Sequence, residues 1–221
     1  MVARCHKVGW NLDIPDYYTT GTHKHGEDNN VRNILDTATA GLAANPDRKF
    51  IYVEVAFFQL WWKEQNATWR KEVRGMVDRG QLEFVNAGWC MSDEAASHFV
   101  DQVDQMTIGH LWLQAQFGRT TVQPRVGWHI DPFGHTSATA FLFAKMGFNM
   151  FQFGRAPPQI NLPAAPGDGS QFVWRPMQSI EDHSVQDLFT YYHKGCKDIN
   201  ADRTLVQPAR LENHRSGCRS T

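Results

Sequence analysis

One short stretch of the chain, Trp128 to His135, brings together a carboxylate, two imidazoles and two aromatic rings. It reads Trp-His-Ile-Asp-Pro-Phe-Gly-His, and Asp131 directly follows an apolar run that begins at Arg125. A carboxylate can act as a nucleophile or bind a metal, and α/β barrels keep their catalytic groups at the carboxyl ends of strands. Asp131 could instead cap the next helix or hold the Pro-Gly turn. The aromatic and imidazole neighbours favour a functional site.

The elements that would position Asp131 alternate between strand-like and helix-like patterns. The strand-like runs are Phe50–Phe57, Leu82–Trp89, Arg125–Ile130, Met150–Phe153 and Phe172–Trp174, and the helical patterns are Val31–Ala44, Leu60–Arg79, Ala95–Phe117 and Ser137–Met146. Alternation at these lengths implies parallel strands joined by right-handed crossovers. The sequence therefore predicts an α/β fold whose first four strands are adjacent and parallel. Asp131 and Arg155 would then open onto one face.

The helix and strand patterns become weaker toward the end of the sequence. Residues 155–170 form a proline-rich loop, and little periodicity follows Trp174. The last residues are polar and rich in Arg. We predict one domain over residues 8–199 and a polar, disordered tail over residues 200–221.

Composition narrows the possible partners. The 221 residues are 42% apolar and 20% charged, as in a globular domain, and the net charge of −1 gives no electrostatic reason to expect a nucleic acid or an anionic membrane. No stretch is long enough to span a bilayer. The oligomeric state is left open. The four cysteines (Cys5, Cys90, Cys196 and Cys218) contain no C-x-x-C pair, which leaves the disulfide pattern undetermined.

The segment from Trp128 to His135 resembles the nucleophile segment of the family-38 glycoside hydrolases, the zinc-dependent retaining α-mannosidases. Further segments resemble the lysosomal branch of that family: Phe50–Phe58, Leu82–Trp89, Met91–Ala96, Asp104–Thr107 and Met146–Phe148. The similarity runs from about Val8 to about Arg175. It implies that the chain is the first part of a seven-stranded β/α barrel with parallel strands.

The resemblance also implies a chemistry and a set of site residues. Asp131 would be the nucleophile and would also touch zinc, while Trp10, Phe133 and Arg155 would line the sugar site. The substrates would be oligosaccharides with terminal α-linked mannose. Retaining glycosidases need a second carboxyl group roughly 5 Å from the nucleophile. The family's acid/base Asp and a further zinc-binding His are expected beyond the end of this chain.

Two other carboxylate positions invite the acid role but have simpler explanations. Asp93 and Glu94 are expected to cap and begin the helix predicted from Ala95. Glu54 is expected inside a strand, paired within the barrel. Neither is assigned as the general acid.

The expected zinc site departs from the family pattern, which has His-x-His-x-Asp before a small residue, Gly and Trp. Counting back from Trp10, the Asp position holds Lys7, the second His position holds Cys5 and the first holds Ala3. A thiolate is a good zinc ligand, so Cys5 could replace an imidazole. The Lys7 ammonium would repel the metal. We therefore expect an incomplete zinc site.

Two sequence features bear on the cellular location of the protein. Asn66-Ala67-Thr68 is an N-glycosylation sequon, which has meaning only in the secretory pathway. Residues 1–7 have no apolar core of the kind that a signal peptide needs. With the resemblance, these features predict glycosylation of Asn66, a lysosomal or secretory location, and a chain that lacks its true beginning.

Two alternative functions compete with the mannosidase. The first is a catalytically inactive fragment that binds sugar weakly, which Lys7 and the missing acid favour. The second is a metal-dependent deacetylase-like hydrolase on a similar incomplete barrel. That enzyme would need a His-x-x-x-His ligand pair, and no such pair accompanies Asp131.

Overall fold

A computed structural model of the chain describes residues 14–19, 30–95, 97–118, 122–154, 171–176 and 187–192. Several sequence predictions concern residues outside these ranges, namely those for Cys5, Lys7, Trp10, Arg155 and the tail 200–221.

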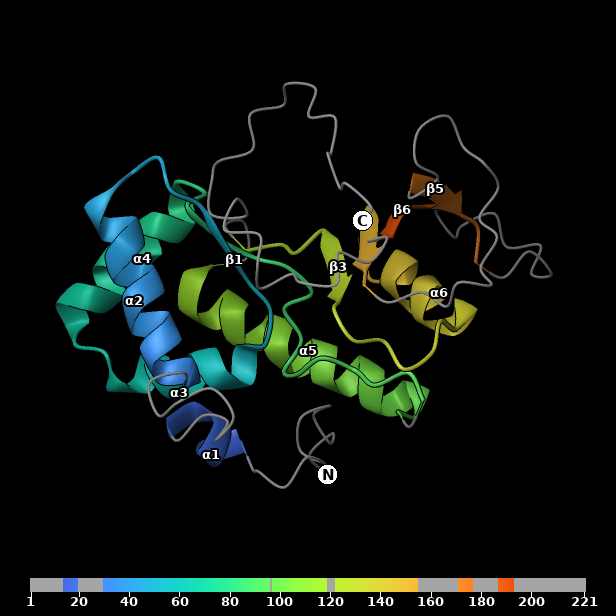
Figure 1. The fold of residues 1–221 in the computed structure, drawn as a ribbon, viewed down its shortest axis with the longest axis horizontal. Coiled ribbons are helices and arrows are strands. Elements are labelled where there is room, and N and C mark those ends of the chain that lie inside the picture. Colours follow the sequence, from blue (N-terminus) through green and yellow to red (C-terminus); the bar gives the residue numbers. More distant parts are fainter. Residues whose placement is uncertain are drawn as a thin grey trace, which may run out of the picture.

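Helices and strands alternate through most of the described chain. The helices are α1 (Ile14–Thr19), α2 (Val31–Ala44), α3 (Val55–Glu64), α4 (Ala67–Asp78), α5 (Phe99–Phe117) and α6 (Ser137–Lys145). The strands are β1 (Phe50–Tyr52), β2 (Leu82–Phe84), β3 (Val126–His129), β4 (Met150–Phe153), β5 (Gln171–Trp174) and β6 (Leu188–Tyr192). In Figure 1, α1 to α4 gather at one end of the molecule, α5 crosses its middle, and α6 lies at the other end beside β3, β5 and β6.

The described strands form two sheets, one with the order β1-β2 and one with the order β3-β4-β6-β5. β1 pairs parallel with β2, and β3 with β4 and β4 with β6 are parallel too, whereas β5 is antiparallel to β6. One backbone hydrogen bond joins the end of β2 to β3, because Asn86 N donates to Val126 O at 2.7 Å. The predicted α/β class with parallel strands is confirmed.

Four predicted elements differ from the structure by more than one residue. The run Leu82–Trp89 is a strand only over Leu82–Phe84, because the backbone turns to a left-handed conformation at Asn86 and Ala87. The apolar run Phe50–Phe57 divides into β1 and the start of α3 at Val55, because a continuous apolar run fits a buried helix as well as a strand. The pattern Leu60–Arg79 breaks at Asn66, whose Oδ1 accepts a hydrogen bond from Trp69 N at 2.8 Å and so caps α4. The helix predicted over Ala95–Phe117 is α5, and it begins at Phe99, not at Ala95.

Two apolar cores lie between the helices and the sheets. In the first, Phe58 is fully buried and its ring contacts those of Trp61, Phe84 and Phe117. In the second, α6 packs on β3 and β4. There a Cβ at Gly127 would lie 2.6 Å from the Phe143 ring, so only glycine allows this approach. The helix-facing residues of β3 and β4 are therefore buried.

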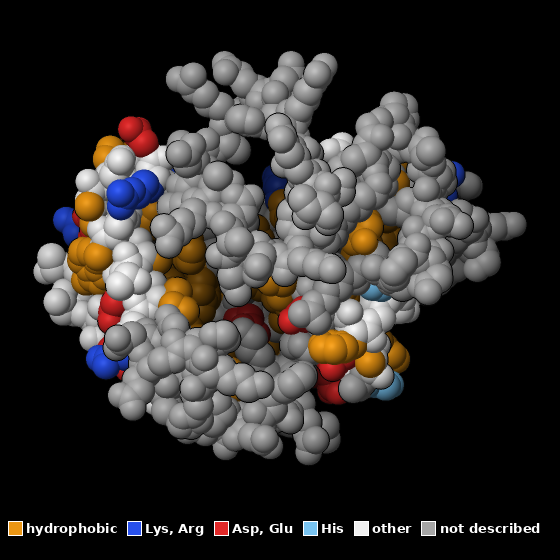
Figure 2. Space-filling model, in the orientation of Figure 1, with side chains coloured by type: hydrophobic (Ala, Val, Ile, Leu, Met, Phe, Trp, Pro, Cys, Tyr) orange, Lys and Arg blue, Asp and Glu red, His pale blue; other side chains and the backbone are white. Residues whose placement is uncertain are grey.

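The opposite faces of the strands are more open. Ile51 of β1, Val173 of β5 and Phe189 of β6 are all large apolar residues with substantial exposure. On the face drawn in Figure 2, apolar and acidic side chains appear together in the middle of the molecule. Among the described helices, none has the length and apolar character needed to cross a bilayer.

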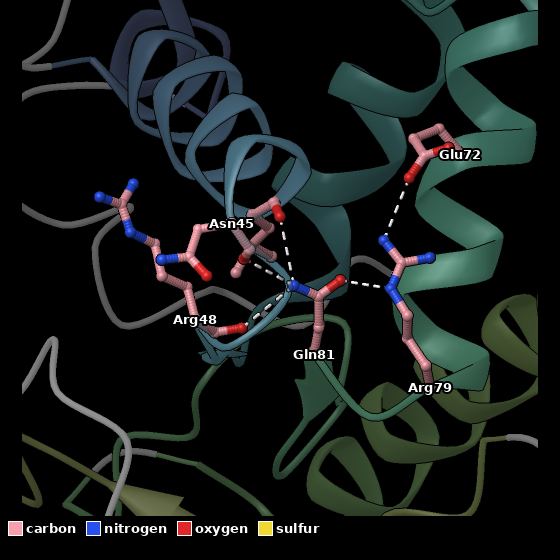
Figure 3. A network of polar contacts seen from close by, with 6 residues as sticks. Asn45, Arg48, Glu72, Arg79 and Gln81 are labelled. Atoms are coloured by element: carbon pink, nitrogen blue, oxygen red, sulfur yellow. Dashed lines mark hydrogen bonds and ion pairs between the residues drawn. The ribbon is translucent and has the colours of Figure 1, made fainter.

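A buried glutamine fixes the start of β2 to the loop between α2 and β1 (Figure 3). Gln81 is 3% exposed, and its Nε2 donates to the carbonyl oxygens of Leu42, Asn45 and Arg48 at 3.2, 3.0 and 3.3 Å. Its Oε1 accepts a hydrogen bond from Arg79 Nε, and Arg79 Nη2 pairs with Glu72 at 3.0 Å. The side chain thus ties the start of β2 to the chain that leads into β1.

We expect Gln81→Leu to lower the free energy of unfolding by about 2–3 kcal/mol, because three carbonyl groups lose their donor in a place that water reaches poorly. Urea unfolding followed by tryptophan fluorescence would measure the change. Glu72→Gln is the matched control, since it removes only a half-exposed ion pair of the same network and should cost below about 1 kcal/mol. Equal losses in the two variants would contradict this role of Gln81.

Candidate active site

Asp131 lies in the loop that joins β3 to α6. β3 ends at His129, and Asp131 follows two residues later with its side chain half-buried. The loop ends at Thr136, which caps α6 because its Oγ1 accepts a hydrogen bond from Ala138 N at 3.2 Å. Asp131 is therefore at the carboxyl end of a parallel strand, as the sequence predicted. Phe133, in the same loop, is 44% exposed.

The end of β4 lies directly beside this loop. His129 is paired in register with Phe153, and Gly154 N donates to His129 O at 2.9 Å. A Cβ at Gly154 would lie 2.6 Å from Ile130 O, so the two backbone segments pass too close together for a side chain at this position. Arg155, the next residue, lies outside the described ranges. The structure thus brings the chain immediately before Arg155 to the loop of Asp131.

A buried carboxylate reaches the base of the loop from another part of the chain. Glu94 Oε1 lies 3.0 Å from His129 Nδ1, and both side chains are only 1% exposed. An ionised carboxylate can only accept a hydrogen bond, so Nδ1 of His129 carries the hydrogen. The ring is held between Phe143 and Phe151, whose centroids lie 5.5 and 5.4 Å from its own.

The expectation that Asp93 and Glu94 begin a helix is corrected by these contacts. The helix starts at Phe99 after the cap His98, whose Nδ1 accepts a hydrogen bond from Val100 N at 3.3 Å. Asp93 instead holds a local turn, since its Oδ1 accepts from Ala95 N at 2.8 Å. Glu94 points into the protein because His129 offers it a buried donor that no local pattern could reveal.

Glu54 also has a different place from the one predicted. It follows the end of β1 at the N-cap position of α3, not inside a strand. Its Oε1 accepts a hydrogen bond from Met91 N at 3.2 Å. The carboxylates of Glu54 and Glu94 therefore both fasten the loop that follows β2, one to the end of β1 and the other to β3.

The chain after β2 adopts an unusual backbone conformation. Asn86 and Ala87 have φ values of 58° and 57°, a left-handed conformation that is costly without glycine and that clusters at functional sites. His110 of α5 donates from Nε2 to Asn86 O at 3.0 Å. Burial lowers the pKa of His110, so its ring is neutral at neutral pH. In the unfolded chain this ring takes up a proton below its ordinary pKa of about 6.5, whereas burial disfavours that proton in the folded protein. His110 therefore lowers the free energy of unfolding as the pH falls below about 6.5.

The metal donors that the structure describes are few. Among the described residues, no three His, Cys, Asp or Glu side chains are grouped so that they could hold a metal ion. Of the predicted ligands, Asp131 is described, and Cys5 lies outside the described ranges.

The sequence matches a known family along nearly its whole length. The family profile described as the glycosyl hydrolases family 38 N-terminal domain matches residues 1–212. The lysosomal alpha-mannosidase of Dictyostelium discoideum is 45% identical over 186 residues, which are 84% of this chain and 18% of that protein. The lysosomal alpha-mannosidase of Homo sapiens is 45% identical over 183 residues, covering 83% of this chain and 18% of its own length. The chain thus spans about a fifth of these relatives.

Solved structures share the fold at low sequence identity. An alpha-mannosidase from Enterococcus faecalis V583 aligns with a TM-score of 0.58 and 17% identity, covering 73% of this chain and 17% of that one. A 4-alpha-glucanotransferase from Thermococcus litoralis aligns with a TM-score of 0.52 and 12% identity, covering 72% of this chain and 23% of its own. These similarities concern the fold alone.

Proposed function

Because the chain belongs to glycosyl hydrolases family 38, whose N-terminal domain it matches, we propose that it carries the nucleophile of a retaining α-mannosidase. Its substrates are oligosaccharides with terminal α-linked mannose. The observation that supports this most directly is the position of Asp131, a half-buried carboxylate at the carboxyl end of a parallel strand. The names of the relatives, lysosomal alpha-mannosidases at 45% identity, point to the same reaction.

The reaction proceeds in two displacements at the anomeric carbon. The Asp131 carboxylate forms a bond to that carbon while the bond to the leaving oxygen breaks and its electron pair departs with the leaving group. Water then attacks the same carbon while the ester bond to Asp131 breaks, and its proton passes to the solvent, so that mannose and the Asp131 carboxylate are released. Two inversions give net retention. A leaving group that is stable as an anion needs no proton in the first step.

We assign the sugar site to Trp10, Phe133 and Arg155. Phe133 shares the loop of Asp131 and is 44% exposed, and aromatic rings pack well on the apolar faces of sugars. Arg155 follows Gly154, whose amide donates to the end of β3. Trp10 is assigned by resemblance to the family alone.

The same resemblance leads us to propose the larger architecture. The described strands would be part of a seven-stranded β/α barrel, with the catalytic domain over residues 8–199 and a polar tail over residues 200–221. Parallel pairing of β1 with β2 and of β3 with β4 supports the barrel. The hydrogen bond from Asn86 N to Val126 O supports adjacency of β2 and β3.

We propose that Asn66 carries an N-linked glycan, in keeping with a lysosomal or secretory location. Asn66 and Thr68 are both exposed at the start of α4. The cap uses Oδ1 of Asn66, whereas a glycan attaches to Nδ2. The sequon can therefore be glycosylated without loss of the helix cap.

Zinc is the metal that the family implies, but the donor set of this chain does not fit it well. Asp131 is the one firm oxygen donor, Cys5 could supply a thiolate, and Lys7 stands where a carboxylate is expected. A zinc ion beside an ammonium group is disfavoured by charge repulsion. No step of the proposed reaction is therefore assigned to the metal.

We expect the unmodified chain to bind zinc weakly, with calorimetry showing no tight stoichiometric site. Changing Cys5→His and Lys7→Asp together should tighten binding by more than about tenfold, because both changes supply ligands and one removes a positive charge. Adding Asp131→Asn to this pair should cancel the gain. Tight binding by the unmodified chain would contradict the prediction and point to Cys5 with His6, or to His23 and His25, as ligands.

The proposed function is tested by trapping the covalent intermediate. A fluorinated mannosyl fluoride, which forms the glycosyl enzyme faster than water removes it, should add one mannosyl group to the chain. Peptide mapping by mass spectrometry should place that group on Asp131. Labelling elsewhere would overturn the assignment. Sugar binding without any labelling would favour the alternative, a catalytically inactive fragment that binds mannosides weakly.

A further inference from the structure

Glu94 connects both ends of the loop that carries Asp131. One carboxylate oxygen accepts from His129 Nδ1 at 3.0 Å, and the other accepts from Thr136 N at 2.8 Å. His129 is the last residue of β3, and Thr136 is the cap of α6. We call these three residues the Glu94 bridge. It closes the base of loop 130–136 as a single side chain with two anchors.

The Glu94 bridge is rigid because each of its parts is packed. Glu94 and His129 are each 1% exposed, and the imidazole lies edge-on to the rings of Phe143 and Phe151. Within the described part of the chain, Nε2 of His129 makes no hydrogen bond, so the polar contact of this ring is the one to Glu94. Losing Glu94 would leave a buried ring and a partly buried amide without their acceptor.

The loop that carries Glu94 is itself held by two other parts of the chain. Glu94 belongs to the loop after β2, where Cys90 N donates to Gln105 Oε1 and Met91 N to Glu54 Oε1, both at 3.2 Å. A Cβ built at Gly134 would lie 3.5 Å from Glu94 Cβ, so Gly134 of the Asp131 loop lies near Glu94. The Glu94 side chain therefore joins the loop after β2 to both ends of the loop after β3, and Glu54, which follows β1, is bonded to the same loop after β2 at Met91.

We propose that Glu94 is a positioning residue that sets the place of Asp131 through His129 and Thr136. The inference rests on the proposed function of Asp131. A nucleophile acts only in a near-attack geometry, and a displacement of about 1 Å can cost on the order of 100-fold in rate. Loop 130–136 has its two ends on the Glu94 bridge, so any change in the length of that side chain moves the loop.

Two conservative variants separate the geometry of the bridge from its charge. Glu94→Gln keeps the length: its oxygen can accept from Thr136 N while its NH₂ donates to Nδ1 of His129 in the other tautomer. Glu94→Asp keeps the charge but is about 1.5 Å shorter and cannot reach both partners. We expect Glu94→Asp to lower kcat for an aryl α-mannoside by about tenfold to 100-fold with little change in KM. The kcat of Glu94→Gln should stay within about threefold of the kcat of the unmodified chain.

Hydrogen exchange supplies a readout that does not need turnover. Peptides covering residues 130–138 should exchange faster in Glu94→Asp than in Glu94→Gln, while peptides of α4 stay unchanged. Glu72→Asp, which shortens an exposed carboxylate, is the control and should alter neither kcat nor exchange. All variants are compared at a temperature where each is folded by circular dichroism.

The possible results decide between the explanations. If Glu94→Asp keeps its kcat, or if Glu94→Gln loses as much as Glu94→Asp, the positioning role is overturned. Faster exchange without a change in kcat would mean that the bridge holds the loop but does not govern Asp131. If the unmodified chain hydrolyses no mannoside, the proposed function fails, and the exchange comparison still shows whether the bridge orders residues 130–138.

Discussion

Replacing Asp131 by Asn should reduce the hydrolysis of an activated aryl α-mannoside by on the order of 10³-fold or more, because a neutral amide of the same shape cannot form the glycosyl ester. Asn fills the same half-buried position at the end of β3, so the fold should not change. The measurement is the release of the aryl alcohol, which absorbs visible light. Circular dichroism of the variant should match that of the unmodified chain.

The matched control for this result is Asp78→Asn. Asp78 is an exposed carboxylate at the end of α4, and its neutralisation should leave turnover unchanged. Activity that survives in Asp131→Asn would refute the assignment of the nucleophile. A complete lack of turnover in the unmodified chain would refute mannoside hydrolysis by this chain.

The choice of leaving group extends the same prediction. An aryl group departs as a stable anion, whereas the alkoxide of a natural linkage needs a proton from a general acid. The carboxylates of Glu54 and Glu94 already accept hydrogen bonds from Met91 N, His129 and Thr136 N. We therefore expect this chain to hydrolyse aryl mannosides and to leave alkyl mannosides almost untouched.

The second large effect concerns stability. Gly109→Ala should lower the free energy of unfolding by about 3 kcal/mol or more, because the new Cβ has no room. It would lie 2.2 Å from Ala87 O, 2.6 Å from Gly88 C and 2.7 Å from Trp89 N, all of them backbone atoms. These atoms cannot move freely, since Trp89 N donates to Gln105 O at 2.9 Å.

Gly41→Ala provides a control of opposite sign. Gly41 lies within α2, and the nearest atom to its new Cβ would be the end of the Arg48 side chain at 3.4 Å. A glycine inside a helix costs roughly 0.5–1 kcal/mol relative to alanine, so this variant should be more stable by a similar amount. Thermal and urea unfolding would measure both variants. Equal stability of Gly109→Ala and the unmodified chain would contradict the close packing of α5 on the chain after β2.

The elements that the sequence predicted best are those whose pattern is local. The helix Val31–Ala44 and the strand Met150–Phe153 have the predicted bounds, because the first has a helical apolar face and a polar stop and the second is bounded by Asn149 and Gly154. The strand Leu188–Tyr192 was not predicted, since no repeated pattern follows Trp174 and the strand gains its partners from β4 and β5.

The candidate site likewise has one feature that a local pattern predicts and others that depend on distant parts of the chain. The position of Asp131 followed from its immediate neighbours, an apolar run before it and Pro-Gly after it. The pairing of Glu94 with His129 joins residues 35 positions apart, and no local spacing encodes it. The left-handed backbone at Asn86 and Ala87 was also hidden, because neither residue type requires it.

The Glu94 bridge has a consequence for the order in which the protein folds. Its partners lie 35 and 42 residues further along the chain, beyond the whole of α5, so the contact forms only after that helix has carried β3 back beside β2. Interactions that form after the folding transition state affect the unfolding rate far more than the folding rate. We expect variants of Glu94 to unfold faster and to refold at nearly the normal rate. The nucleophile loop would thus be ordered last when the domain folds and released first when it opens.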